Sequence, residues 1–514
     1  MKRGSIAAIV LSALLALLGG HLRAGEALQF PVEEFVLDNG MAFMVVERHT
    51  APVFSGYISV GVGSAYEKTG NIGSAHLLEH MMFKGSREVG TSDYEAEKDL
   101  IVKEDSVWAK IDRAVRETRF IELNQPEKLE EHLNYIEKLR LILDSLTILS
   151  SQYVIQNEFD MIYTRNGAAQ FNAFTGYDNT NYFVSLPANR LELWFAMESG
   201  RLKHPALREF FPERDVVSEE RRLSVETSPE AKLFEQLIGT AFIAHPYQIF
   251  WEWQSEENNL TRDDLADFFE TYYIPQRITV AVVGDVAVAR VRELAEEYFG
   301  DMPSRPEPEP IYTREPEQPG ERRVDVHYES NPVLSIAYHK TSFDDPGEPA
   351  FRIIEDLLGR GRTSRLYKAL VLEKQLCLNV SVYTFPGSSL GDMHDGVLCI
   401  DAYPKEGVTT LEVEEAIYAE LDRLAAEPVS QRELTKIKNN IDASFIWASY
   451  SNIGLAGYLA RAQNLARDWR YLSTMRDNLL AVTAEDIRQT AAEYFTENNR
   501  TVATLIPKRK GEEK

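Results

Sequence analysis

Residues 75–83 read AHLLEHMMF and contain the pattern His-x-x-Glu-His. No Gly or Pro interrupts this run, and its apolar positions predict one buried helix. Because His76 and His80 are four positions apart, they share a face of that helix, and both imidazoles can reach one ion. Glu79 is adjacent to His80 in the sequence, and its carboxylate can approach the same ion. Two imidazole nitrogens with an adjacent carboxylate are typical of a zinc ion and the water that it activates.

The motif alone is only suggestive. A lone His on an apolar helix is more often packed or hydrogen-bonded than metal-bound. A chance match to the pattern is expected in on the order of one or two such chains per hundred. A third ligand elsewhere in the chain is therefore needed.

A second charged stretch, residues 211–222, reads FPERDVVSEERR and predicts a helix with Pro in its first turn. Glu213 and Glu220 are seven positions apart, so two helical turns place both on one face. Glu219 is expected to be an exposed acid with an Arg partner. The apolar contacts of this helix are expected from Val216, Val217 and Leu223.

Length and the first residues indicate an exported, multidomain protein. At 514 residues with 44% apolar content, the chain is long enough for two domains or more. A basic start, an apolar run over residues 6–18 and small residues near 24–27 predict a secretory signal peptide over residues 1–27. No later stretch approaches the roughly 20 apolar residues of a membrane helix. We expect a soluble mature chain in the periplasm.

Charge and cysteine content exclude other classes of protein. The net charge of −25 argues against nucleic acid and anionic membrane surfaces as partners, and acidic walls would favour cationic peptides. Cys377 and Cys399 are the only cysteines, so no disulfide framework holds the fold. They could pair in an oxidising compartment, but two buried thiols are the favoured interpretation.

Periodicity predicts an alternation of strands and helices interrupted by one insertion. Residues 94–160 are charged and helix-periodic with a break at residues 124–126, which indicates an inserted helical hairpin. Strands are predicted at residues 41–47, 52–63, 168–175, 180–186 and 278–283. The expected organisation is a signal peptide (1–27), an N-terminal catalytic domain (28–301), a Pro-rich linker (302–321) and a C-terminal homologous domain (322–514).

The C-terminal domain is predicted from an internal repeat. The sequence PVLS at residues 332–335 echoes PVFS at residues 52–55, and FRIIEDLLGRG at residues 351–361 echoes residues 75–85. The sequence offset between the two copies differs by four residues from one pair of segments to the other, which one insertion or deletion in a loop explains. The second half is therefore expected to repeat the architecture of the first.

The repeat also bears on the motif. In the second copy Arg352 stands for His76 and Asp356 for His80, so the apolar frame persists while both nitrogen ligands are gone. Had the histidines only packed the core, apolar replacements would be expected. The contrast favours a functional role for the histidines of the first copy and predicts a metal-free second domain.

At this point the chain resembles the pitrilysin, insulysin and mitochondrial-processing-peptidase family of zinc peptidases, over nearly all of its mature length. In that family His-x-x-Glu-His is followed by a distant Glu-x6-Glu. The resemblance implies one Zn²⁺ per chain held by His76, His80 and Glu220, with Glu79 as general base. Glu213 matches the acid that orients the site from behind the ligands.

The same resemblance implies the fold and the substrate strand. The implied fold class is α+β: two duplicated α/β-roll domains, each an antiparallel-rich sheet packed with helices, with the helical hairpin inserted in the first. Asn172, Ala173 and Phe174 look like the family's edge strand, where substrate pairs backbone to backbone. His245-Pro246-Tyr247 and residues 282–285 are further family-like landmarks.

The chain departs from the family pattern in two places. The interval from His80 to Glu220 is long, and the hairpin accounts for most of the excess at small energetic cost. The family often carries Arg and Tyr seven apart in the second domain, where Leu372 and Asn379 stand here. The family's working enzyme needs four such domains around a chamber, so a second homologous chain is expected. A heterodimer is preferred, and a homodimer remains open because a one-residue gap near Val371 would change the comparison.

The predicted function is that of an exported zinc metalloendopeptidase acting on unfolded peptides or extended segments. In this hypothesis zinc lowers the pKa of a water molecule toward 7, and Glu79 takes its proton and returns it to the leaving amine. The main alternative is a non-catalytic chamber subunit that binds peptides or assembles with an active partner, which predicts a damaged ligand set. A structural zinc site is disfavoured, because three ligands and a free carboxylate leave the site open.

Overall fold

A computed structural model describes residues 30–508 of the chain. The predicted signal peptide, residues 1–27, lies outside the described residues. Among the helices that are described, none is long and apolar enough to cross a membrane.

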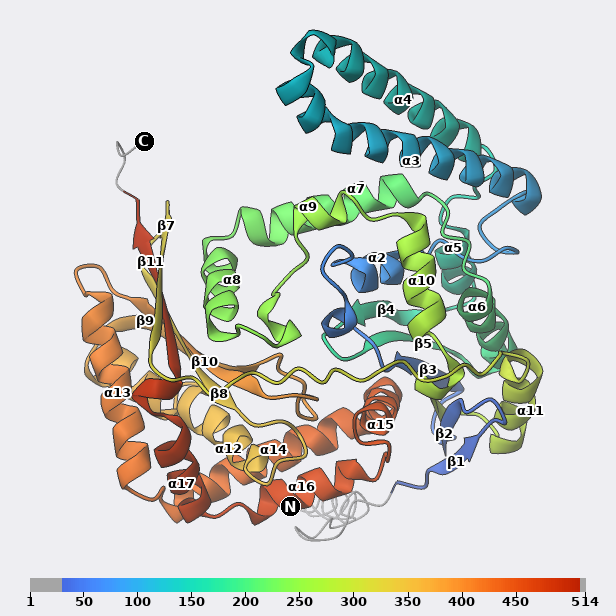
Figure 1. The fold of residues 1–514 in the computed structure, drawn as a ribbon. Helices are drawn as coiled ribbons and strands as arrows, with labels where there is room; N and C mark the ends of the chain where they lie inside the picture. Colours follow the sequence, from blue (N-terminus) through green and yellow to red (C-terminus); the bar gives the residue numbers. More distant parts are fainter. Residues whose placement is uncertain (1–29, 509–514) are drawn as a thin grey trace, which may run out of the picture. The chain divides into compact units, whose positions relative to one another are not determined.

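The first half of the described chain is built on a six-stranded sheet in the order β1-β2-β6-β3-β5-β4 (Figure 1). Its strands are β1 Glu33–Val36, β2 Ala42–Glu47, β3 Val53–Val60, β4 Ala169–Thr175, β5 Thr180–Pro187 and β6 Ile278–Gly284. Strand β2 runs parallel to β6, and the other neighbours are antiparallel. The run of buried apolar residues in β6 fits its place inside the sheet, and β4 lies at an edge.

The second half contains a five-stranded sheet in the order β7-β11-β8-β10-β9. Its strands are β7 Arg322–Tyr328, β8 Val333–Lys340, β9 Cys377–Phe385, β10 Gly396–Pro404 and β11 Arg500–Pro507. Strand β7 is parallel to β11 and the rest are antiparallel, which is the pattern of β2-β6-β3-β5-β4. The predicted α+β class, with two sheets packed by helices, is confirmed, and the shared topology matches the sequence repeat. The predicted domain boundaries stay a prediction.

Helices surround both sheets. In the first half they are α2 Ser74–Met81, α3 Tyr94–Asn124, α4 Leu129–Ser150, α5 Glu158–Arg165, α6 Leu191–Lys203, α7 Phe210–Arg221, α8 Pro229–Ala241, α9 Gln254–Glu257, α10 Arg262–Tyr272 and α11 Val288–Phe299. In the second half they are α12 Glu348–Gly359, α13 Thr410–Ala426, α14 Gln431–Tyr450, α15 Asn452–Ala466, α16 Tyr471–Ala481 and α17 Ala484–Tyr494. The motif helix and the Glu213 helix lie where the sequence predicted them. The hairpin begins at the predicted residue, but its second helix ends at Ser150, before the predicted end at residue 160.

One prediction about the Glu213 helix, α7, is wrong in detail. Val217 is buried as expected, but Val216 and Leu223 are exposed. Adjacent residues on a helix point about 100° apart, so Val216 cannot share the inward face of Val217. Leu223 lies past the end of α7 in a π-helical segment, Arg222–Glu226, whose wider turn changes the phase. Glu219 is exposed and pairs with Arg222, as expected.

Each half supplies a helix to the sheet of the other half. Helix α8 lies against β7, β8 and β11, and its Leu237 shares a hydrophobic cluster with Ala503. Helix α15 lies against β3 and β6, where the Asn464 amide donates to the carbonyl of Ser59 and accepts from the Thr279 hydroxyl. The two sheets therefore depend on each other for burial of their apolar faces.

The Pro-rich stretch between the halves contains no helix or strand, but it is anchored. The carboxylate of Glu315 accepts backbone N–H groups of residues 243–245. Gln318 is buried and donates to the carbonyl of Arg500. These hydrogen bonds hold the stretch against the fold, which a freely flexible spacer would lack.

The inserted hairpin is fixed at one end. Helices α3 and α4 lie side by side (Figure 1), and α3 ends at the predicted break before Pro126. At its root Glu97 pairs with Arg208 at 2.8 Å, and Glu104 pairs with Arg262 at 3.0 Å, all four side chains being buried. Removing one member of such a pair would leave an uncompensated buried charge.

The two cysteines lie in neighbouring strands without facing each other. Cys377 pairs in register with Pro404, and Cys399 pairs with Tyr383. Both thiols are free and buried, which confirms the prediction, and burial raises the pKa of Cys377 to about 11.

Candidate metal centre

Helix α2 begins at a backbone position that favours glycine. Gly73 has a φ of 100°, and a Cβ there would lie 3.1 Å from the Cβ of Glu252. The Glu67 carboxylate accepts the N–H groups of Gly73 and Ala75, which satisfies two donors of the first turn. The apolar face of the helix is buried, so the opposite face carries His76 outward.

The structure brings a third candidate ligand to the two histidines. The Nε2 atoms of His76 and His80 lie 3.9 and 3.6 Å from one carboxylate oxygen of Glu220. Zinc holds nitrogen and oxygen ligands at roughly 2.0–2.1 Å, which places tetrahedral ligands about 3.3–3.4 Å from each other, so both distances are close to those of a bound ligand set. In residues 30–508, no other group of three His, Cys, Asp or Glu residues brings its ligand atoms as close.

Carboxylates behind the histidines fix the orientation of both rings. The Nδ1 atom of His76 is 2.8 Å from Glu252, and the Nδ1 atom of His80 is 2.9 Å from Glu213. Because each Nδ1–H donates to a carboxylate, each Nε2 presents its lone pair toward Glu220. The donor set therefore fits a zinc ion.

Charge also stabilises the contacts of His76 with Glu252 and of His80 with Glu213. Burial opposes ionisation of Glu213, but hydrogen bonds from His80 and Lys84 outweigh it and lower the pKa of Glu213 to about 2. Burial likewise lowers the pKa of His76, but the Glu252 hydrogen bond and nearby carboxylates raise it overall to about 9. A metal ligand must be a neutral imidazole, so a bound cation would replace that proton.

Glu79 lies beside this group without belonging to it. Its carboxylate accepts a 2.6 Å hydrogen bond from the hydroxyl of Thr175, the last residue of β4. Burial raises the pKa of Glu79. The candidate base is thus tied to the strand predicted to hold substrate.

That strand, β4, has one side paired with β5, and no other described strand pairs with it. Asn172 and Phe174 are exposed and Ala173 is buried. Gln170 has a φ of 52° where the register shifts, which bends the strand before it reaches Thr175. An exposed edge next to Glu79 is where a peptide could add as a further strand, although the substrate role of these residues stays a prediction.

Sequence reasoning missed Glu252, Thr175 and Lys84. Glu252 lies within the aromatic stretch of residues 247–253, and its distance of 176 residues from His76 gives no signal. Tyr247 of this stretch is buried, and Trp251 lies edge-on to the His76 ring. Lys84 could have been found, because it stands one helical turn after His80.

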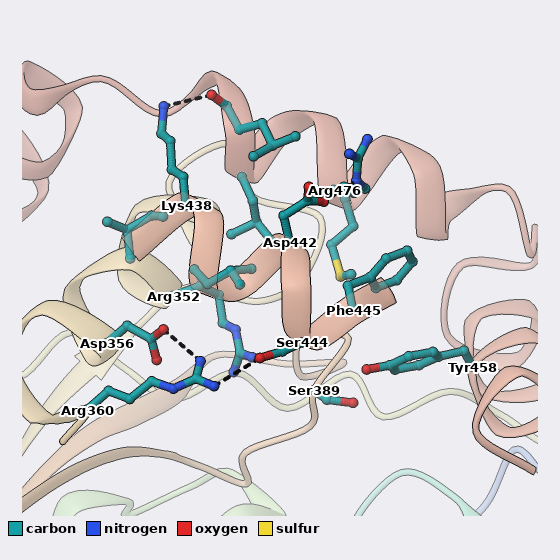
Figure 2. Close-up of a pocket in the computed structure, with 15 residues that line it drawn as sticks. Arg352, Asp356, Arg360, Ser389, Lys438, Asp442, Ser444, Phe445, Tyr458 and Arg476 are labelled. Atoms are coloured by element: carbon teal, nitrogen blue, oxygen red, sulfur yellow. Dashed lines mark hydrogen bonds and ion pairs between the residues drawn. The ribbon is translucent and has the colours of Figure 1, made fainter. Parts of the chain in front are cut away.

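The second half shows what replaced the ligands. Figure 2 shows Arg352 and Asp356 lining a cavity of about 90 Å³. Arg360 donates to Asp356 at 2.9 Å and to the Ser444 hydroxyl, so the acid is already paired. The corresponding position in this half therefore offers a cation, Arg352, and an acid that is already paired in place of the two imidazoles.

Glu252 gives a direct test of this geometry. Replacing Glu252 with Gln is expected to weaken zinc binding by about 10–100-fold, because His76 loses the acceptor that fixes its ring. Glu256→Gln is the matched control, since Glu256 lies on the same segment and accepts the N–H groups of Gly70 and Ile72. Competition with a chelating dye measures both affinities. Equal affinities of the two variants would contradict the role of Glu252.

Comparison with known proteins adds family information. The model described as "Insulinase (Peptidase family M16)" matches residues 43–104 and 142–250, and "Peptidase M16 inactive domain" matches residues 259–441. The "Zinc protease PqqE" of Helicobacter pylori is 30% identical over 378 residues, covering 71% of this chain and 82% of that protein. The bovine "Mitochondrial-processing peptidase subunit beta" is 21% identical, covering 92% and 83%. A crystal structure of a protease from Helicobacter pylori has a TM-score of 0.74 and 26% identity, covering 93% of this chain and 99% of that one.

Proposed function

Because this chain belongs to peptidase family M16, the insulinase family, we propose that it is an exported zinc metalloendopeptidase acting on unfolded peptides or extended segments. The observation that carries the proposal is the approach of Glu220, from α7, to the Nε2 atoms of His76 and His80. Glu79 lies beside these residues and is not one of the three candidate ligands. Because the set of candidate ligands is complete, it argues against a non-catalytic chamber subunit. Export rests on the predicted signal peptide.

Each residue of the site has a separate role in amide hydrolysis. His76, His80 and Glu220 would hold the zinc, which when bound polarises the substrate carbonyl and acidifies a water molecule. Glu79 takes the proton of that water and delivers it to the leaving amine nitrogen. Thr175 holds the carboxylate of Glu79 in place through its 2.6 Å hydrogen bond. The edge of β4 pairs with an extended substrate backbone, which disfavours folded substrates.

A second homologous chain is part of the proposal, with a heterodimer preferred to a homodimer. Leu372 and Asn379 are both exposed and cannot act as the Arg and Tyr that hold a substrate carbonyl in similar enzymes. A related chain would supply those groups. The similar mitochondrial peptidase is itself named as a subunit.

Metal removal and peptide cleavage test the function together. The purified chain is expected to carry one zinc ion and to cleave unstructured peptides, alone or with a related chain. A chelator should abolish cleavage, and added zinc should restore it, since the proposed reaction needs the ion. Stoichiometric zinc without cleavage of any peptide, in either setting, would overturn the enzyme proposal and favour the binding subunit. Absence of zinc would overturn the metal site.

A further inference from the structure

The second half contains a cavity beside the helix that repeats the metal-binding motif. The cavity has a volume of about 90 Å³ and lies between this helix, α12, and helices α14, α15 and α16. Thr384 of β9 lies 3.5 Å from the Glu355 carboxylate of α12, as Thr175 of β4 is bonded to Glu79 of α2. The frame of the motif is therefore repeated here, although both imidazoles are replaced.

One side of the cavity is basic and has unused hydrogen-bond donors. Arg352 and Arg360 point to the same side, next to Ser444 (Figure 2). Arg360 is engaged by Asp356 and by the Ser444 hydroxyl. Among the described residues, Arg352 makes its one polar contact with Glu355, at 3.3 Å through a single Nη atom. A guanidinium group has five N–H donors, so most of those of Arg352 are left for a ligand.

A tyrosine hydroxyl is a further donor. Tyr458, from α15, directs its hydroxyl end into the cavity (Figure 2). Its ring is stacked on Phe445 with the centroids 5.3 Å apart, while its hydroxyl forms no hydrogen bond with any described residue. A hydroxyl that is held in place by ring stacking can donate to an anion bound beside Arg352.

The remaining wall of the cavity is apolar. It is formed mainly by Ile441, Phe445, Met475 and Leu479. Donors on one side and hydrocarbon on the other suit a ligand that has an acidic group and an apolar part. The cavity is smaller than the roughly 150 Å³ that holds a benzene molecule. The enclosed part of the ligand is therefore limited to an acidic group and a short side chain.

The charges of the lining favour a singly charged anion. Asp442 is paired with Arg476 at 2.5 Å, and Asp356 is paired with Arg360. Lys438 donates to a backbone carbonyl and forms no ion pair with a described residue. The lining thus has a small excess of positive charge in a chain of net charge −25. One carboxylate matches this excess, whereas a phosphate dianion would also be repelled by the two Asp residues.

From these observations we propose that the cavity between α12 and α14 binds the carboxylate of a ligand that carries a small apolar group. The carboxylate accepts hydrogen bonds from Arg352 and Tyr458, and the apolar group contacts Phe445 and Met475. Binding goes beyond the proposed peptidase activity and needs neither zinc nor catalysis.

Two sources share this ligand chemistry: the C-terminal residue of a peptide and a small free carboxylic acid. Arg360 and Ser444 are exposed, so the basic side of the cavity is open to solvent and leaves room for a chain that continues outward. The binding experiment separates the two sources.

Titration calorimetry of the full chain tests the proposal, with the Glu79→Gln variant used so that no peptide is cleaved. The probes are N-acetyl-leucine and a short unstructured peptide that ends in leucine, each as the free acid and as the amide. Both acids are expected to bind, and both amides at least tenfold more weakly, because an amide carries no charge for Arg352. Tighter binding of the peptide acid assigns the cavity to peptide ends, and equal affinity of the two acids assigns it to small carboxylic acids.

Substitutions in the same background locate the binding. Arg352→Gln is expected to weaken binding of N-acetyl-leucine on the order of 10–100-fold, and Tyr458→Phe several-fold. The phenylalanine keeps the ring stacked on Phe445, so this variant remains informative if Arg352→Gln fails to fold. Arg362→Gln is the matched control and should bind normally, since Arg362 is exposed just past α12 and does not line the cavity.

Four results would each overturn the proposal. They are equal affinities for acids and amides, tighter binding of inorganic phosphate than of N-acetyl-leucine, wild-type affinity in both cavity variants, and binding that is lost in Glu220→Ala but kept in Arg352→Gln. The last result would place the carboxylate at the metal centre. None of the four bears on whether the metal centre cleaves peptides.

Discussion

Glu79→Gln is expected to reduce peptide cleavage by a factor of about 10²–10⁴ while the zinc content stays unchanged. Gln has nearly the same shape but cannot accept the proton of the attacking water, and general base catalysis contributes about that factor. Glu79 is not among the three groups that approach each other as ligands, so the metal site should survive. Cleavage rates and zinc content of the same protein preparation measure both quantities.

The second half supplies a matched control for Glu79. Glu355 occupies the corresponding position of the repeat, where it pairs with Arg352 at 3.3 Å, and Glu355→Gln should leave cleavage unchanged. If Glu79→Gln cleaves within a few-fold of the wild-type rate, another group is the base. A loss of zinc in that variant would instead place Glu79 among the ligands.

Glu220→Ala is expected to lose both bound zinc and activity. Two imidazoles four residues apart hold an ion weakly, and the third protein ligand completes a catalytic zinc site. Removing it leaves His76 and His80 with no anionic group among the ligands. Zinc content after dialysis should fall from one per chain to nearly none, with cleavage falling below detection.

The adjacent residue is the control for Glu220. Glu219 is exposed and engages only Arg222 in the described residues, so Glu219→Ala should keep zinc and full activity. Comparing Glu220→Ala with Glu219→Ala distinguishes a ligand role of Glu220 from a general effect of removing a negative charge from α7. Retention of stoichiometric zinc by Glu220→Ala would remove the basis of the proposed site.

Local patterns in the sequence predicted much of the fold. The motif helix α2, the hairpin break near Pro126 and the alternating strands followed from turn residues and periodicity, which act over a few residues. The edge position of β4 and the second sheet followed from the family resemblance and the repeat. The predictions for Val216 and Leu223 were wrong, because Val216 turns about 100° away from the buried Val217 and Leu223 lies in the π-helical segment past the end of α7.

For the candidate site, too, local patterns predicted some of the residues and long-range contacts decided the others. Spacing placed His76 and His80 on one face, and the resemblance pointed to Glu220 and Glu213, whose roles await the tests above. Glu252 escaped prediction because its contact with His76 joins segments far apart in the chain. The exchange of α8 and α15 between the sheets also escaped, since neither helix carries a sign of which sheet it covers.

By itself the sequence determined the elements, the duplication and the residue types available for metal chemistry, because short-range backbone preferences and periodic apolar positions decide those. Only the tertiary structure decided which carboxylates stand behind each imidazole, that Thr175 holds Glu79, and which apolar faces remain uncovered. Those outcomes depend on long-range packing. The separation of two segments along the chain does not indicate whether they will contact each other in the fold.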